Sequence, residues 1–159
     1  MYMFHVRYAR AHGLPYVSKC RYHVKTDVAQ CSQSANVEIF MVLFRRDCAN
    51  QDLIWLWETL LRAHRVEEYQ GFMIGENVSQ WAMQYMLSFA YRYIMNLATE
   101  RRGKRLSMVT HTLLQMDDVL MTSGNRKNLK SAVRKFVRFV KDKLGLTIKP
   151  DWHIKELEL

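Results

Sequence analysis

Two adjacent carboxylates, Asp117 and Asp118, lie between apolar stretches at residues 107–114 and 119–122 whose composition favours β-strands. Like charges this close raise each other's pKa unless a cation neutralises them. A pair of carboxylates at a strand–turn–strand junction therefore indicates a metal site. An ordinary acidic turn is the alternative that this spacing leaves open.

A third carboxylate, Asp27, comes near the end of a predicted strand at residues 22–28. Val24, Thr26 and Val28 share one face of that strand, and Asp27 lies on the other. If this strand pairs with the strand–turn–strand segment that carries Asp117 and Asp118, three carboxylates come together. Oxygen ligands suit Mg²⁺, and two such ions can clamp the attacking and leaving oxygens of a phosphoryl transfer. A solvent-exposed strand-end Asp27 is the alternative.

The composition predicts one globular domain with a basic surface. The chain has 159 residues, of which 49% are hydrophobic, and 24 Lys and Arg outnumber 15 Asp and Glu. A net charge of +9 favours a polyanionic partner, although a basic surface also serves solubility alone.

The cysteines and the apolar runs argue against a zinc or disulfide-rich protein and against a membrane or secreted protein. Cys20, Cys31 and Cys48 lack the spacing of a zinc site or a disulfide framework. No apolar run is long enough for a membrane span, and residues 1–10 lack a signal-peptide pattern. We therefore expect a soluble cytoplasmic protein with no membrane association.

The elements that would position the carboxylates alternate along the chain. We expect helices at 37–45 after an Asn36 cap, from Asn50 or Asp52 to about 65, at 78–96 and at 129–144, where Gly145 ends the last helix. Residues 70–77 and 100–105 are predicted loops, 146–149 a strand, and the tail another short strand. The second helix should present one apolar face through Leu53, Trp57, Leu60 and Leu61. This order predicts an α+β fold with helices packed on an antiparallel sheet.

Four sequence blocks in this order resemble the palm of bacterial reverse transcriptases of the group II intron, retron and diversity-generating type. Residues 25–32 resemble the block with the first catalytic Asp, and 75–80 resemble the Gly-x-x-x-Ser-Gln block that opens the long palm helix. Residues 115–118 resemble the aromatic-x-Asp-Asp box. The helix ending at Gly145, with residues 146–152, resembles the closing segment. The resemblance implies a polymerase palm, with its catalytic hairpin in an antiparallel sheet packed on helices.

The resemblance also implies roles for individual residues. Asp27, Asp117 and Asp118 would be catalytic and would bind two Mg²⁺ ions, which Mn²⁺ can replace. The implied nucleotide-binding residues are Val28, Ser32, Gly75, Ser79, Gln80 and Lys149. Gly75 would allow close backbone approach to the nucleotide. A helix-capping role for Asn77 or Ser79, and a surface position for Lys149, stay open as alternatives.

Two departures from the family pattern affect the expected site. Cys31 and Ser32 stand where the family usually has an aromatic residue that excludes a ribose 2′-hydroxyl. Gln115 replaces the aromatic residue before Met116. These changes predict relaxed sugar discrimination or a degenerate site.

The resemblance covers the palm alone. We expect residues 1–21 to be a short remnant before a palm at 22–159, with the fingers and thumb largely absent. Substrates would be a template–primer of RNA or DNA and nucleoside triphosphates, and a separate chain would supply the fingers or thumb. Without the triphosphate grip, RNA-directed DNA polymerase activity should be weak or absent in the isolated chain.

Two non-catalytic classes remain as alternatives. The first is a nucleic-acid-binding module that uses the basic helix at 129–143 and the loop at 101–105. The second is a palm remnant that packs with a partner chain through Trp55, Met73, Met83 and Met86, although burial of these residues in the core is the simpler expectation.

Overall fold

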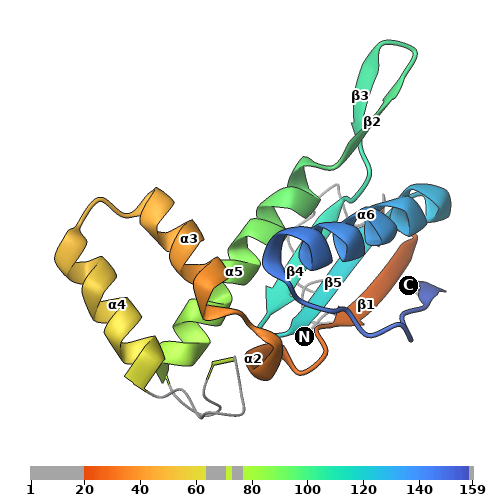
Figure 1. The fold of residues 1–159 in the computed structure, drawn as a ribbon. Helices are drawn as coiled ribbons and strands as arrows, with labels where there is room; N and C mark the ends of the chain where they lie inside the picture. The colour runs from red at the N-terminus through yellow and green to blue at the C-terminus, as the bar shows by residue number, and fades with distance from the viewer. Residues whose placement is uncertain (1–19, 64–70, 73–76, 158–159) are drawn as a thin grey trace, which may run out of the picture.

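The computed structural model describes residues 20–63, 71–72 and 77–157. Four antiparallel strands form the central sheet in the order β4-β5-β1-β6 (Figure 1). The strands are β1 (Tyr22–Asp27), β4 (His111–Gln115), β5 (Asp118–Ser123) and β6 (Ile154–Glu156). The two strands that flank the acidic turn, β4 and β5, are hydrogen-bonded neighbours, and β1 lies beside β5.

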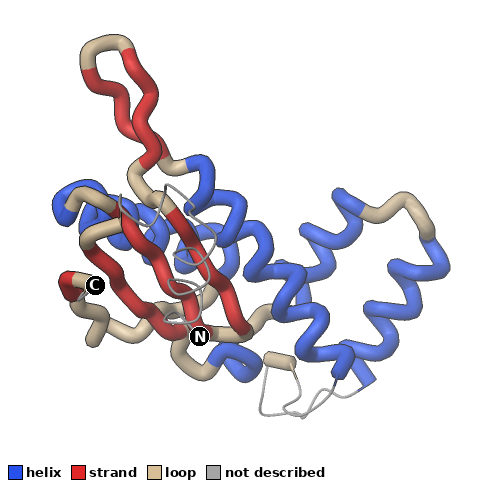
Figure 2. The backbone as a smooth tube through the Cα atoms, turned by 180° about the vertical axis from the view of Figure 1, so that it is seen from behind, coloured by secondary structure: helices blue, strands red, loops and turns tan. Residues whose placement is uncertain are grey.

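Strand alternation gives the sheet one apolar, buried face and a second face of mixed composition, on which Leu113 and Leu120 lie beside Lys25. Val24, Thr26 and Val28 are buried, as the sequence predicts, whereas Lys25 and Asp27 project to the opposite side. Two helices, α5 (Asn77–Asn96) and α6 (Arg126–Leu144), cover the apolar face, and Figure 2 shows the sheet from its other side, with these helices behind it. The predicted α+β architecture, an antiparallel sheet packed on helices, is therefore confirmed.

Helix α6 forms for the reasons visible in its sequence. Asn125 caps its start by accepting hydrogen bonds from the backbone N–H groups of Lys127 and Asn128. Its apolar positions repeat at helical spacing and are buried against the sheet, and Gly145 ends the helix in the left-handed conformation. The buried residues of this helix are Leu129, Ala132, Val133, Phe136, Val140 and Leu144.

Helices α3 (Val37–Asp47) and α4 (Gln51–Ala63) form an antiparallel pair beside α5 (Figure 1). Asn36 and Asn50 cap them, in agreement with the sequence prediction. The predicted apolar face of α4 is corrected, because Leu53 is exposed whereas Ile54 and Leu61 are buried. An aromatic cluster of Phe40, Phe44, Trp57, Phe72 and Tyr85 joins α3, α4 and α5.

The segment predicted as a charged loop at 100–105 is a hairpin. Strands β2 (Ala98–Arg101) and β3 (Lys104–Ser107) pair with each other and project away from the body (Figure 1). Arg102 and Gly103 both have positive φ, the backbone geometry that suits a two-residue hairpin turn. Four of the six residues at 100–105 are cations, so the sequence shows no apolar–polar alternation that would predict strands.

Two smaller differences concern the chain near the carboxylates. Residues 146–149 do not form the predicted strand, because they make only one isolated bridge, between Ile148 and Val28, the residue that follows β1. A four-residue helix, α2 (Cys31–Ser34), follows β1. Strand β6 fulfils the prediction of a short strand in the tail. Among the described helices, none is both long and apolar enough to cross a membrane.

Candidate active site at the end of the sheet

The acidic turn joins β4 to β5 through two residues, Met116 and Asp117. Met116 adopts φ 53, an unusual conformation for a residue other than glycine, and Gln115 pairs with Asp118 across the turn. The backbone N–H of Val28 donates to the carbonyl of Asp117 at 3.1 Å. The turn is thereby fixed against the end of β1.

The strand register brings Asp27 directly opposite Asp118. This pairing confirms the expectation that β1 lies beside the acidic hairpin. Each of these carboxylates is held by a lysine of the same chain: Lys149 Nζ lies 2.6 Å from Asp27 Oδ2, and Lys25 Nζ lies 2.7 Å from Asp118 Oδ2. Hydrogen bonds to these carboxylates, followed by their negative charges, raise the pKa of both lysines above the ordinary value.

Backbone hydrogen bonds hold Lys149 in place although 146–149 is not a strand. The Lys149 N–H donates to the carbonyl of Asp27 at 2.9 Å, and the Ala29 N–H donates to the carbonyl of Thr147 at 2.8 Å. These bonds follow Gly145, where α6 ends. Lys149 therefore lies at the surface, as one alternative expected, and also contacts the Asp27 carboxylate.

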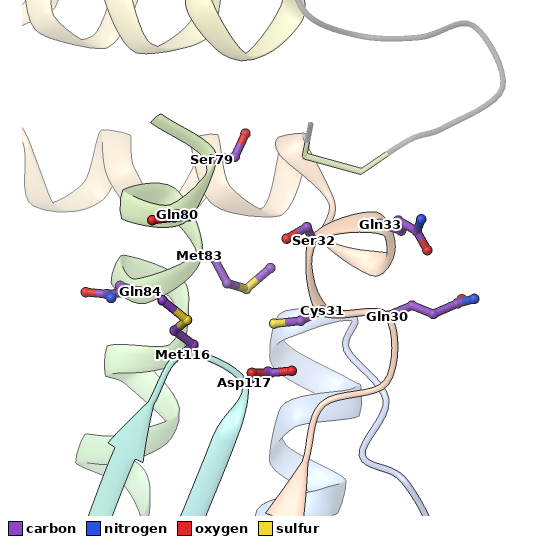
Figure 3. Close-up of a pocket in the computed structure, with 10 residues that line it drawn as sticks. All are labelled: Gln30, Cys31, Ser32, Gln33, Ser79, Gln80, Met83, Gln84, Met116 and Asp117. Carbon is purple, nitrogen blue, oxygen red and sulfur yellow. The ribbon is translucent and has the colours of Figure 1, made fainter. Parts of the chain in front are cut away.

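Asp117 faces a cavity of about 340 Å³ between α2, α5 and the acidic turn (Figure 3). This volume is at the lower end of the range for small-ligand sites, about 300–1,000 Å³. Three predicted nucleotide-binding residues, Ser32, Ser79 and Gln80, share the cavity with Asp117. The full lining is Gln30, Cys31, Ser32, Gln33, Ser79, Gln80, Met83, Gln84, Met116 and Asp117.

The remaining predicted residues have different positions. Val28 is buried, and it contributes its backbone N–H to the turn. Ser79 is buried at the start of α5. Lys149 contacts Asp27 and is not among the residues that line the cavity. Gly75 and most of the predicted loop at 70–77 lie outside the described residues.

Sequence reasoning missed Gly71 as a packing position. A Cβ atom on Gly71 would collide with the backbone carbonyls of Ser32 and Gln33 in α2. The next residue, Phe72, donates its N–H to the Ser32 carbonyl at 2.7 Å. The absence of a side chain at Gly71 thus allows this segment to support α2, which lines the cavity.

Sulfur-containing side chains form part of the cavity wall. Burial raises the pKa of the Cys31 thiol to about 12, and the negative charges of Asp117 and Asp27 act in the same direction. The thiol is therefore protonated near neutral pH. Met83 and Met116 add two further sulfur atoms to the lining (Figure 3). Met83 and Met86 are buried, as the core interpretation expects, whereas Trp55 is 67% exposed.

The carboxylates supply the oxygen donors that Mg²⁺ prefers. Asp27 Oδ1 is a buried oxygen with no hydrogen-bond partner among the described residues. However, within those residues no three His, Cys, Asp or Glu side chains are grouped to hold a metal ion. The expected convergence of three carboxylates is corrected to this extent, because lysines hold Asp27 and Asp118 while Asp117 faces the cavity. At Asp27 and Asp118 a metal ion would compete with the two lysines.

Comparison with known proteins identifies the fold. No protein-family model and no curated protein matches the chain. The structure is similar to apo telomerase from Candida tropicalis truncated from its C-terminal domain, with a TM-score of 0.61, 16% identity and 98% coverage of this chain. It is also similar to Candida tropicalis telomerase in complex with a TWJ fragment of telomeric RNA, with a TM-score of 0.62, 16% identity and 97% coverage.

These matches cover only part of the telomerase chains. This chain spans 34% of the first and 29% of the second. Telomerase is a reverse-transcriptase-related enzyme with a polymerase fold. At this identity the similarity establishes the architecture, and the protein therefore has a reverse-transcriptase-like fold.

Proposed function

We propose that this chain is the palm of a reverse-transcriptase-like nucleotidyltransferase and that Asp27, Asp117 and Asp118 are its catalytic carboxylates. One arrangement carries the proposal. The strand register places Asp27 opposite Asp118, and Asp117 of the same turn lines a cavity together with Ser32 and Ser79. Residues from three separate sequence blocks are thereby neighbours at one end of the sheet.

The cavity is proposed to receive the nucleoside triphosphate. Ser32, Ser79 and Gln80 would contact it, and Val28 would lie beside it. Gly75 would let the protein backbone approach the nucleotide closely, and Lys149 would lie near the phosphates. The primer 3′-oxygen forms a bond to the α-phosphorus, the bond to pyrophosphate breaks, and the hydroxyl proton leaves for solvent. The small side chains of Cys31 and Ser32 would admit a ribose as readily as a deoxyribose.

The carboxylates would also hold the metal. Two Mg²⁺ ions, or Mn²⁺ in their place, would supply Lewis-acid stabilisation of the reacting oxygens when bound at Asp27 and Asp117. Asp118 would support the site from the adjacent strand. Lys25 and Lys149 would act as internal counter-ions in the absence of metal, since they keep the carboxylates from repelling one another.

The wider system is also part of the proposal. An RNA or DNA template–primer and nucleoside triphosphates would be the substrates, and a separate chain would supply the fingers or thumb. Assignment to the bacterial subclass depends on the sequence blocks alone. We expect weak or no extension by the isolated chain, because a palm by itself does not position the triphosphate.

Two measurements test the catalytic proposal. Calorimetry should show Mn²⁺ or Mg²⁺ binding in about the millimolar range or tighter. Binding should be lost in Asp117→Asn and retained in Asp52→Asn, a charge-matched change on α4. Primer extension should be run with RNA and DNA templates and with both sugar types. Wild-type protein that gives neither metal-dependent heat nor extension would contradict the proposal.

A second candidate function is binding of nucleic acid without catalysis. Lys127, Lys130, Arg134, Arg138 and Lys141 form a cationic stripe, since spacings of three and four residues place them on one exposed face of α6. Within the described residues none of them forms an ion pair with an acid. The β2–β3 hairpin adds further exposed cations.

Binding through this stripe should weaken steeply with salt, because each phosphate contact releases counter-ions. A fluorescence-anisotropy titration at two salt concentrations tests it. If the affinity for an oligonucleotide does not change with salt, the second candidate is wrong.

A partner chain that covers the exposed Trp55 and Trp81 would instead make this chain a packing subunit.

A further inference from the structure

A second cavity lies between the start of α6 and the edge strand β6. It measures about 710 Å³ and is lined by Arg126, Lys127, Lys130, Trp152, His153 and Ile154. We call it the Trp152 cavity. Its lining has three cations, the indole of Trp152, the imidazole of His153 and no carboxylate.

The Trp152 cavity is separate from the candidate active site. Helix α6 starts just after Ser123, which pairs with Tyr22 at the opposite end of β1 from Asp27. Tyr22 and Asp27 are five residue steps apart, or roughly 17 Å. The lining residue Ile154 pairs with Val24, which is three steps or roughly 10 Å from Asp27. A ligand of the Trp152 cavity would therefore not occupy the acidic turn.

The chemistry of the lining specifies an anionic ligand that also has an aromatic surface. Arg126, Lys127 and Lys130 are exposed, and within the described residues none is paired with an acid. Trp152 packs on the core with part of its surface still accessible, so its ring is fixed in place. Phosphates suit the cations, and an unpaired base suits the indole.

We propose that the Trp152 cavity binds one nucleotide of a single-stranded nucleic acid, with its base on Trp152 and its flanking phosphates on Arg126, Lys127 and Lys130. The strand continues along the cationic stripe, which spans about 21 Å of α6. Duplex bases are already stacked on each other, so only a single strand gains the contact with Trp152. This inference rests on the second candidate function, nucleic-acid binding.

Binding of labelled oligonucleotides to the full chain tests the proposal. Single-stranded DNA, single-stranded RNA and duplex DNA are compared by fluorescence anisotropy at two salt concentrations. Trp152→Leu should weaken single-strand binding by about 5- to 100-fold and leave duplex binding within about twofold. Trp152→Phe should restore most of the single-strand affinity. Equal losses for single strand and duplex would overturn the stacking role.

Two triple variants with the same charge change separate the cavity from general electrostatics. The cavity variant changes Arg126, Lys127 and Lys130 to alanine, and the control changes Arg92, Lys135 and Lys143, three exposed cations that lie outside the cationic stripe. The cavity variant should lower the salt slope for a single strand by about 2, at roughly 0.7 per phosphate contact, and the control by clearly less. Equal changes in both would overturn the proposal.

These outcomes distinguish the inference from the function on which it rests. Wild-type protein that binds no oligonucleotide would remove the second candidate function and this inference with it. Wild-type binding that both triple variants weaken equally would remove the inference alone. Stronger binding of poly-glutamate than of single strands would indicate an acidic protein partner and also overturn it. If Trp152→Leu does not fold, the triple variants decide, since they alter exposed side chains only.

Discussion

Lys149 Nζ contacts Asp27 Oδ2 at 2.6 Å, although the two residues are 122 positions apart in the sequence. The contact joins the segment after α6 to the end of β1 and neutralises a carboxylate proposed to bind metal. The positive charge of Lys149 disfavours a metal ion at the same carboxylate. Metal binding should therefore compete with Lys149.

We predict that Lys149→Met tightens Mn²⁺ binding by about 5- to 10-fold, because it removes the competing cation. Without metal, the same variant should unfold slightly more easily, because the partly exposed ion pair is lost. Calorimetry and urea unfolding measure the two effects. Lys143→Met, an exposed lysine of α6, is the control and should change neither. Unchanged metal affinity in Lys149→Met would contradict the competition.

Asp117 should control the reactivity of Cys31. The thiolate is the reactive form, and removal of the nearby negative charge in Asp117→Asn should lower the thiol pKa from about 12. Alkylation by iodoacetamide at pH 8.5 should then be faster by a few fold. The rate is measured by mass spectrometry with Cys20 and Cys48 replaced by alanine. Asp52→Asn on α4 is the control, and an equal acceleration there would refute the contact effect.

Tyr85 should make stability depend on pH in the alkaline range. Burial, followed by its 2.9 Å hydrogen bond to Asp47, raises the pKa of Tyr85 to about 12 from 10.0. The protonated phenol is favoured in the folded state, so its contribution is complete below pH 10 and decreases as the pH rises from 10 to 12. Urea midpoints at pH 9 and pH 11 measure the loss. Tyr85→Phe should show a smaller difference between these midpoints, and an unchanged difference would exclude this residue as the cause.

Gly71→Ala should destabilise the protein by about 1–3 kcal/mol, because its Cβ would displace the backbone of α2. Urea unfolding measures the change. Gly103→Ala is an informative comparison, since a Cβ there meets no atom within 4 Å but the residue has φ +70. That variant should therefore cost about 1 kcal/mol through conformation alone. Equal stability of Gly71→Ala and the wild type would show that α2 moves without loss.

The features that sequence predicted correctly have local signals. The period of α6, its end at Gly145, the Asn36 cap and the alternation of β1 all depend on residues near one another in the chain. The pairing of β1 with the acidic hairpin was also expected, from the placement of Asp27 at a strand end and from the family resemblance. The structure confirms that pairing.

The features that sequence did not predict depend on distant or competing interactions. The Lys25 and Lys149 ion pairs depend on the strand register and on where the chain returns after α6. The 146–149 segment has strand-like composition, but it makes only one isolated bridge, to the residue that follows β1. In the 98–107 hairpin, the turn geometry at Arg102 and Gly103 outweighs the low strand preference of a charged run. The catalytic roles of the site residues and the boundary at residue 22 remain predictions.

Strand β6 also bears on how molecules of this protein meet one another. It forms one edge of the sheet, is only three residues long, and carries the exposed Lys155 and Glu156. Short, charged edge strands offer few free backbone groups to a strand from a neighbouring molecule. The sheet is therefore protected on this side against edge-to-edge aggregation, while Trp152 just before β6 stays accessible to a ligand.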